Sequence, residues 1–326
     1  MSELLKINNL DVKFDTDEGR ITAVENVSIS VKQGEVLGIV GESGSGKSVT
    51  AKAIMQLNPG NTIYNEDAEI IIDGENVIKF TSKEDLKKIR GGKVSMIFQE
   101  PMASFAPAIK IGDQMVEQLL LHKNIKKEEA KSISLDMLTR VGITDTEKRF
   151  NQYAFELSGG MRQRAMIAMA LSTMPKLLLA DEPTTALDVT IQAQVLKLMK
   201  DIIKEYKMGV IFITHDLGVI AQTADQIAVM YLGCVVEKGS VNEILKNPKH
   251  PYTKGLIAAL PDVNNLEAPL KPIPGNIPSP LERPTNCVFR TRCPNPTHEC
   301  KEGKTPMGLV EISPGHWVDK CCVNCG

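Results

Sequence analysis

The chain has 326 residues and is 42% apolar, 24% charged and 4% aromatic, a composition typical of a folded globular protein rather than a disordered or fibrous one. Its 38 Lys and Arg residues against 40 Asp and Glu give a net charge of −2, which argues against a protein that wraps a polyanion. The longest apolar runs are far shorter than the roughly 20 residues of a membrane span. Residues 1–10 lack the pattern of a secretory signal. We therefore expect a protein of the cytosol or of the cytosolic face of a membrane.

Predicted strands and helices alternate along residues 1–260. The N-terminal part is rich in predicted strands, over residues 4–14, 21–31, 36–40 and 68–72. Continuous apolar runs predict strands buried on both faces at residues 94–98, 177–180, 210–214 and 226–231. Apolar residues three and four apart predict helices over residues 111–122, 127–141, 159–172 and 191–205. This order predicts an α/β fold with a parallel sheet, and the nearly all-helical residues 102–172 predict an inserted helical subdomain.

Cysteine and proline are concentrated at the C-terminal end. Six of the seven cysteines and eleven of the eighteen prolines lie within residues 261–326. Because this segment offers little periodic apolar sequence, we predict a loop-rich extension over residues 261–326 after a first domain over residues 1–260.

Residues 41–48, Gly-Glu-Ser-Gly-Ser-Gly-Lys-Ser, follow a predicted strand and open a predicted helix, which is the context that the pattern GxxxxGK[ST] requires. The glycines let backbone N–H groups turn onto phosphate oxygens, and the helix start adds the positive end of its dipole. Lys47 is expected to bridge the β- and γ-phosphates, and the Ser48 hydroxyl to bind Mg²⁺. A flexible Gly/Ser loop is the alternative, which the strand–loop–helix context disfavours. The predicted nucleotide-binding residues here are Gly41, Ser43, Gly44, Ser45, Gly46, Lys47, Ser48 and Val49.

Polar residues that follow three of the buried strands complete a candidate site for phosphate hydrolysis. Asp181 and Glu182 end the run Leu-Leu-Leu-Ala-Asp-Glu; Asp181 is expected to reach Mg²⁺ through water, and Glu182 to polarise an attacking water. The alternative for Glu182 is a carboxylate at a helix start, since Pro183 follows. Ligands collect at such strand ends in open α/β sheets, so we expect His215 to contact the γ-phosphate and Gln99 the metal or water. Each of these two residues alone also suits a structural role.

Residues 157–164, Leu-Ser-Gly-Gly-Met-Arg-Gln-Arg, predict a second anion-binding helix start. Ser158 suits an N-cap, and Gly159 and Gly160 let a phosphate approach closely. An ordinary capped helix is the alternative. A second anion site would be redundant within one chain, so this segment is expected to meet the nucleotide of another subunit.

These motifs, with Ala186-Leu187-Asp188 and His215 after them, resemble those of the ATP-binding cassette (ABC) family over about residues 4–260. The resemblance implies a P-loop NTPase cassette with a mixed sheet core, an antiparallel β subdomain and a helical subdomain at about residues 102–172. It also implies a head-to-tail dimer in which two ATP molecules lie between the phosphate loop of one subunit and residues 158–160 of the other.

The family resemblance implies roles for single residues. Glu182 is expected to be the general base, and His215 to position it and the γ-phosphate. Asp188 is expected to communicate across the subunit interface. Phe14 lies where the family stacks an aromatic ring on adenine; ordinary strand packing is the alternative.

Residues 250–261 and 273–280 resemble the C-terminal extension of ATP-binding subunits of dipeptide, oligopeptide and nickel importers. Residues 99–107 resemble the segment of those subunits that is expected to contact the membrane subunit, with Phe105-Ala106 in place of the usual Leu-Asn. The implied partners are two membrane-spanning permease subunits, a second and paralogous ATPase subunit and, indirectly, an extracytoplasmic substrate-binding protein. The implied location is peripheral, on the cytoplasmic side of the cell membrane, with the cargo left open.

The spacing Cys287-x5-Cys293-x6-Cys300-x20-Cys321 resembles the pattern that is associated with a [4Fe–4S] cluster in this subfamily. Four thiolates on a core-poor segment offer a cross-link that packing does not supply. Unliganded cysteines and a zinc site are the alternatives; zinc sites usually contain close pairs, such as Cys322-Val-Asn-Cys325. We take Cys321 as the fourth ligand, with Cys322 and Cys325 as alternatives.

Two functions fit these motifs. The first is an ATPase that powers a peptide importer, and the second a soluble ABC ATPase that acts on nucleic acid or ribosomes through the cysteine-rich extension. The chain has one cassette, no coiled-coil heptads, and no basic stripe with interleaved aromatic residues in its extension. The importer ATPase is therefore favoured, and no nucleic-acid partner is expected.

Overall fold

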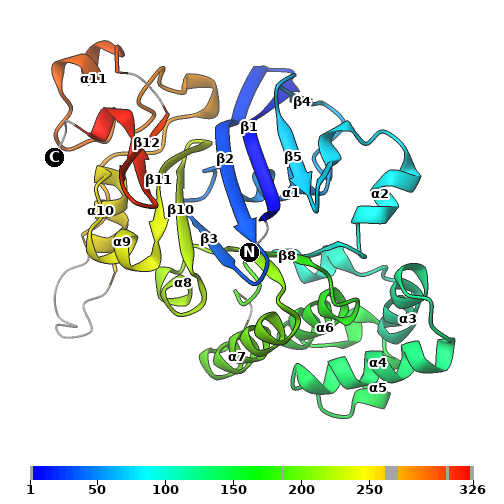
Figure 1. Cartoon of the computed structure of the whole chain (residues 1–326). Helices are drawn as coiled ribbons and strands as arrows, with labels where there is room; N and C mark the ends of the chain where they lie inside the picture. The colour runs from blue at the N-terminus through cyan, green and yellow to red at the C-terminus, as the bar shows by residue number, and fades with distance from the viewer. Residues whose placement is uncertain (1–2, 186, 261–270, 306–307, 324–326) are drawn as a thin grey trace. The chain divides into compact units, whose positions relative to one another are not determined.

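The structure is a computed structural model of the chain, and it describes residues 3–185, 187–260, 271–305 and 308–323 (Figure 1). The chain divides into two compact units. The first comprises Met1–Leu5, Val31–Val36 and Lys79–Ile213, and the second Lys6–Ser30, Leu37–Ile78 and Thr214–Gly326. The phosphate loop and the C-terminal extension therefore belong to the same unit.

The first unit contains three parallel strands. They are β7 (Val94–Ile97), β8 (Leu177–Asp181) and β9 (Gly209–Ile213), with β8 in the middle. All residues of the three strands are buried. Strands covered on both faces form continuous apolar runs, which is why the sequence pattern predicts these three correctly.

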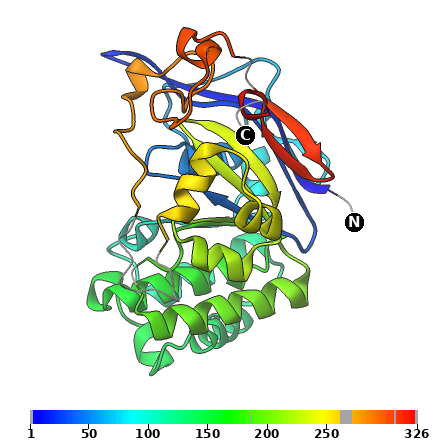
Figure 2. The same cartoon turned by 90° about the vertical axis from the view of Figure 1, so that its left-hand side faces the viewer.

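Helices form most of the rest of the first unit. The predicted helices at residues 111–122 and 159–172 are confirmed at both ends as α3 and α6, and both pack against α4 (Figure 2). On α7 the side chains of Val195, Met199 and Ile202 are buried, at the spacing of one helix face. The helices of this unit are α2 (Lys83–Ile89), α3 (Ile111–His122), α4 (Lys127–Arg140), α5 (Thr146–Phe150), α6 (Gly159–Ser172) and α7 (Val189–Tyr206), with short 3₁₀ turns η2 (Pro101–Ser104) and η3 (Ala154–Glu156).

The second unit contains an antiparallel sheet built largely from the N-terminal strands. Its order is β2-β1-β5-β6, and β4 also pairs with β1. Burial alternates along much of β1 and β2, as expected of strands with one covered face. The strands are β1 (Glu3–Thr16), β2 (Gly19–Lys32), β4 (Thr62–Tyr64), β5 (Glu69–Ile72) and β6 (Glu75–Asn76).

A second group of strands in this unit runs in the order β12-β13-β11-β10-β3. Strand β3 (Val36–Val40) is parallel to β10 (Gln226–Tyr231), and the other pairs are antiparallel. The outer hairpin, β12 (Leu309–Ser313) and β13 (His316–Asp319), comes from the extension and pairs with β11 (Cys234–Ser240) (Figure 1). The prediction that the extension is mostly loop missed this hairpin, because β12 is largely exposed and lacks a clear apolar alternation.

The helices of the second unit are short. The helix α10 was not predicted; it begins with Pro251 at its first position and His250 as N-cap, which is a favoured helix start. The helices are α1 (Lys47–Ile54), α8 (Leu217–Thr223), α9 (Val241–Lys246), α10 (Pro251–Ala258) and α11 (His298–Glu302), with 3₁₀ turns η1 (Val77–Lys79), η4 (Pro280–Glu282) and η5 (Lys320–Cys322).

A buried polar pair joins the hairpin of the extension to β11. His316 and Glu237 are both 0% exposed, and His316 Nε2 lies 2.8 Å from Glu237 Oε1. The same carboxylate accepts the backbone N–H groups of Lys249 and His250. A buried carboxylate is costly unless it is hydrogen-bonded, so this one residue holds β11, β13 and the start of α10 together.

We predict that His316→Ala lowers the free energy of unfolding by about 2–3 kcal/mol, because it removes a hydrogen bond to a buried charged group. The single tryptophan of the chain is the adjacent Trp317, so urea unfolding followed by tryptophan fluorescence reports on this hairpin. The control is His298→Ala, whose side chain is 84% exposed and whose loss is expected to change stability by less than about 0.5 kcal/mol. Equal midpoints for the two variants would contradict the role of the pair.

Candidate functional site

The phosphate loop connects β3 to α1 and requires glycine at two positions. A Cβ at Gly41 would overlap the carbonyl oxygen of Met230 on β10, and one at Gly46 would lie 2.6 Å from the carbonyl oxygen of Ala23 on β2. Gly46 also has φ of 94°, which residues with a side chain rarely adopt. The backbone of neighbouring strands thus encloses the base of the loop.

Lys47 lies inside the loop. It is 8% exposed, and its ammonium donates to the carbonyl oxygens of Gly41 and Glu42, both at 2.8 Å, and to Ser45 Oγ at 3.3 Å. A cation held in such a partly desolvated position attracts an anion more strongly than one in water. Of the other predicted loop residues, Ser43 and Gly44 are exposed, Ser45 is buried, and Ser48 and Val49 are half-buried.

Glu42, the second residue of the loop, is held by residues from far along the chain. Its carboxylate accepts two hydrogen bonds from Arg292, at 2.7 and 3.2 Å, and its backbone N–H donates to the Tyr252 hydroxyl at 2.8 Å. Burial lowers the pKa of Arg292, but the hydrogen bonds to Glu42 and Tyr231 outweigh it and leave that pKa raised. The guanidinium is therefore charged. The sequence analysis missed Glu42, Tyr252 and Arg292 as functional residues.

Two more predicted nucleotide residues lie in the second unit. Phe14 is half-buried on β1, opposite Thr62 of β4. His215 is exposed and directly precedes Asp216, which caps α8 through its carboxylate. Both rings are accessible to a ligand, and their contacts to adenine and to the γ-phosphate stay predictions.

The first unit brings Glu182 and Gln99 together. Gln99 Nε2 donates to Glu182 Oε2 at 3.3 Å, and Thr185 Oγ1 donates to the same oxygen at 3.2 Å. Glu182 has φ of 48°, a conformation that costs a residue with a side chain about 1–2 kcal/mol. Its N–H donates to the carbonyl oxygen of Ile213 at 2.8 Å. Strained residues of this kind cluster at functional sites, which supports Glu182 as a catalytic candidate.

Asp181 ends strand β8 and is 3% exposed. It directly precedes Glu182, which forms a bend after the strand and is half-buried. Carboxylate oxygens suit Mg²⁺, and the position of Asp181 fits the predicted contact to a metal-bound water.

The segment Ser158-Gly159-Gly160 forms an exposed helix start. Ser158 Oγ accepts the N–H of Met161 at 3.3 Å and caps α6. A Cβ at Gly159 would meet nothing within 4 Å, so the space beside this residue is open. Gln163 on the same helix donates to the carbonyl oxygen of Pro183, which ties this helix to the turn after Glu182.

Asp188 is the N-cap of α7, and its Oδ1 accepts the N–H of Ile191 at 3.0 Å. It is exposed, as a residue at a subunit interface would be in a single subunit. Ala186 of the same predicted motif lies outside the described residues.

Two of the predicted cysteine ligands, Cys287 and Cys321, approach each other in the second unit. Cys321 Sγ lies 3.4 Å from Cys287 Sγ and 3.4 Å from Cys322 Sγ. The contact with Cys321, together with burial, raises the pKa of Cys287. Burial raises the pKa of Cys293, and the charges of Cys287 and Cys300 add to that rise. Of the four predicted ligands, the structure thus brings Cys287 and Cys321 into contact, with Cys322 beside Cys321; Cys325 lies outside the described residues.

His250 adds a nitrogen to this group. Its ring and the thiols of Cys321 and Cys322 have ligand atoms within 4.8 Å of one another. Burial lowers the pKa of His250 to about 3, so the ring is neutral. Because Nδ1 accepts the N–H of Tyr252, Nε2 carries the proton. Nε2 is buried with no hydrogen-bond partner among the described residues, and a nitrogen that carries a proton is not a metal ligand.

Comparison with known proteins identifies the family. Residues 24–185 match the model of the "ABC transporter" family, and residues 236–300 match the "Oligopeptide/dipeptide transporter, C-terminal region". The "Oligopeptide transport ATP-binding protein OppD" of Bacillus subtilis is 47% identical over 319 residues, which are 98% of this chain and 88% of that protein. The chain belongs to the ABC transporter ATP-binding family.

Further relatives agree with this assignment to the ABC family. The "Dipeptide transport ATP-binding protein DppD" of Bacillus subtilis is 45% identical over 327 residues, 100% of this chain and 95% of that protein. A solved structure described as the dimeric post-hydrolysis state of an ATP-binding cassette bound to ADP and Pi has a TM-score of 0.65 at 28% identity, covering 73% of this chain and 98% of that one. The α/β cassette fold predicted from the motifs is confirmed.

Proposed function

We propose that this ABC protein is the ATP-hydrolysing subunit that powers import of di- or oligopeptides through a membrane ABC transporter. One observation carries the proposal. The same chain contains a phosphate loop whose lysine is held inside it and the C-terminal region of the oligopeptide/dipeptide transporter family. Relatives with 45–47% identity over nearly the whole chain are named as oligopeptide or dipeptide transport ATP-binding proteins. The cargo within these two peptide classes is set by partners outside this chain.

The proposed chemistry divides among residues of both units. The N–H groups of the phosphate loop and the Lys47 ammonium would bind the β- and γ-phosphates, stabilising charge that develops as the terminal phosphate leaves. Glu182 would accept a proton from the attacking water, and Gln99, already hydrogen-bonded to Glu182, would orient that water. His215 would position Glu182 and the γ-phosphate. Bound Mg²⁺, for which Ser48, Gln99 and Asp181 are the proposed ligands, would neutralise phosphate charge.

A second ATPase subunit completes the proposed site. The open space beside Gly159 and the exposed carboxylate of Asp188 leave room for a nucleotide held by a facing subunit. A helix start offers several unpaired N–H groups to a phosphate. We propose that Ser158, Gly159 and Gly160 bind the nucleotide of that subunit, which we expect to be a paralogue.

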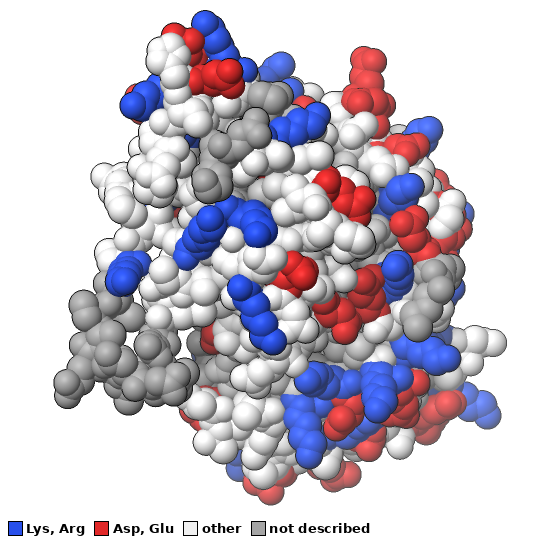
Figure 3. Space-filling view, turned by 60° about the vertical axis from the view of Figure 1, so that its left-hand side comes forward, with Lys and Arg blue, Asp and Glu red and all other residues white. Residues whose placement is uncertain are grey.

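The proposed partners in the membrane are two permease subunits, with an extracytoplasmic substrate-binding protein acting through them. None of the described helices has the length and hydropathy needed to cross a bilayer, and we place the protein peripherally at the cytoplasmic side of the membrane. On the face shown in Figure 3, Lys and Arg side chains are interspersed with Asp and Glu. This mixture gives no support to the alternative in which the protein acts on nucleic acid.

We predict that Glu182→Gln lowers the ATPase rate of the reconstituted transporter by at least about 100-fold, because it removes the general base. The affinity for MgATP is expected to change little, since the phosphate loop and Lys47 remain. The measurements are phosphate release by the complex of both ATPase subunits with their permease, and nucleotide binding by the same preparation.

Glu205→Gln on α7 is the matched control for this charge change, because that side chain is 56% exposed. It is expected to hydrolyse ATP and import peptide at the wild-type rate. Undiminished hydrolysis by Glu182→Gln would contradict the assignment of the base, and a wild-type complex without peptide-stimulated hydrolysis would contradict the proposed function.

We further propose that Cys287, Cys293, Cys300 and Cys321 hold a [4Fe–4S] cluster. The support is the spacing of these cysteines in the sequence, together with the contact between the thiols of Cys287 and Cys321. When bound, such a cluster would cross-link the extension. A zinc ion is the alternative. With Zn–S distances of about 2.3 Å, a tetrahedral zinc site places two sulfur ligands about 3.8 Å apart. The sulfur of Cys321 lies at a similar distance, 3.4 Å, from those of Cys287 and Cys322.

Metal analysis of anaerobically purified protein tests this proposal. We predict about four iron and four acid-labile sulfide per chain, lost in Cys321→Ser and retained in Cys322→Ser. Cys321 and Cys322 are adjacent and almost equally buried, at 6% and 8% exposure. Cys322→Ser is therefore the matched control for Cys321→Ser. One zinc without sulfide would replace the cluster by a zinc site, and protein without either metal would refute both.

A further inference from the structure

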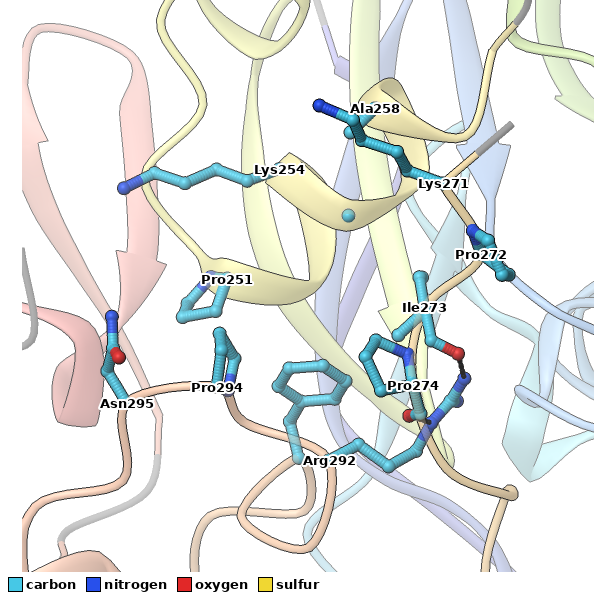
Figure 4. Close-up of a pocket in the computed structure, with 12 residues that line it drawn as sticks. Pro251, Lys254, Ala258, Lys271, Pro272, Ile273, Pro274, Arg292, Pro294 and Asn295 are labelled. Carbon is cyan, nitrogen blue, oxygen red and sulfur yellow. Dashed lines mark hydrogen bonds between the residues drawn. The ribbon is translucent and has the colours of Figure 1, made fainter. Parts of the chain in front are cut away.

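The C-terminal extension contacts the phosphate loop through Arg292. The guanidinium is almost fully buried, with 4% of the side chain exposed. Its Nη1 and Nη2 donate to the two oxygens of Glu42 at 2.7 and 3.2 Å. Its Nε donates to the carbonyl oxygen of Pro274 at 3.0 Å, and Nη2 to that of Ile273 at 3.3 Å (Figure 4). All three nitrogens are therefore used, and the planar group is fixed.

The surroundings of Arg292 are rigid. Tyr231, Tyr252 and Phe289 pack on one another with ring centroids 4.7–5.4 Å apart, and the guanidinium carbon lies 5.7 Å from the centre of the Tyr231 ring. Tyr252 is 0% exposed and accepts the N–H of Glu42. Thus the side chain and the N–H of Glu42 are both anchored by buried groups, while its carbonyl oxygen accepts from Lys47.

A carboxylate in a phosphate-binding loop raises an electrostatic problem. An unpaired negative charge at Glu42 would repel a triphosphate bound to the same loop, and in a partly buried setting this repulsion is weakly screened. Arg292 neutralises that charge with the bidentate geometry that suits a carboxylate. Fixing Glu42 also reduces the ordering that the loop needs when a ligand binds.

We infer that Arg292 is a positioning residue of the nucleotide site, through which the C-terminal extension neutralises Glu42 and holds the phosphate loop in its ATP-binding conformation. The inference rests on the proposed ATPase function and gives the extension a role in nucleotide affinity. Arg292 directly precedes Cys293, so the segment that carries two of the proposed metal ligands also carries this contact.

The test compares variants in the reconstituted complex by KM for MgATP, kcat and direct nucleotide binding. Arg292→Gln is expected to raise KM and Kd for MgATP by about tenfold, equivalent to about 1.4 kcal/mol, with kcat at saturating ATP within about twofold of wild type. The double variant Glu42→Gln/Arg292→Gln is expected to recover much of this loss, because it removes the unpaired charge. Arg292→Lys keeps the charge without the two-pronged geometry and is expected to lie between wild type and Arg292→Gln.

Arg290→Gln is the matched control, because it makes the same charge change in the same segment at a half-buried residue. It is expected to leave KM unchanged. Melting temperature, iron and zinc are measured for every variant, so that unfolding or metal loss is recognised. If the double variant binds as weakly as Arg292→Gln, or if Arg290→Gln weakens binding equally, the inference is overturned. A KM for Arg292→Gln within twofold of wild type also overturns it. A wild-type complex that does not hydrolyse ATP instead overturns the proposed function.

Discussion

The narrow space around the phosphate loop is the constraint on which the nucleotide site depends. The carbonyl oxygens of Met230 and Ala23 lie where side chains at Gly41 and Gly46 would have to go. The backbone of the loop can therefore follow this path only because these positions have no Cβ. Lys47 then fills the interior with a cation. A triphosphate is the ligand proposed for this loop, because a phosphate anion suits both a cation and backbone N–H groups.

Buried polar contacts join distant parts of the chain within the second unit. Glu42 is held by Arg292 and Tyr252, while Glu237 holds His316 and the start of α10. A buried charge is tolerated only with such partners. Each pair therefore joins a segment of the extension to an earlier part of the second unit. By this account the extension is part of the cassette that carries the phosphate loop, rather than an appendage to it.

Local sequence patterns predicted much of the fold. The strands β3 and β10 and the helices α3 and α6 were predicted with their observed ends, because apolar periodicity and helix caps are encoded within a few residues. The phosphate loop and Glu182 could be predicted as site residues because each lies in a short local sequence motif. The pairs Arg292–Glu42 and His316–Glu237 were not predicted. Each joins residues far apart in the chain, and nothing near either partner indicates which distant charge it meets.

The most direct test is a structure of the chain in complex with the proposed paralogous ATPase and permease, determined with Mg²⁺ and a non-hydrolysable ATP analogue. The account predicts that residues 41–48 enclose one triphosphate, with Arg292 still paired to Glu42. It also predicts that residues 158–160 touch the triphosphate held by the facing subunit. A nucleotide that contacts only the subunit that binds it, or that lies away from residues 41–48, would contradict the account.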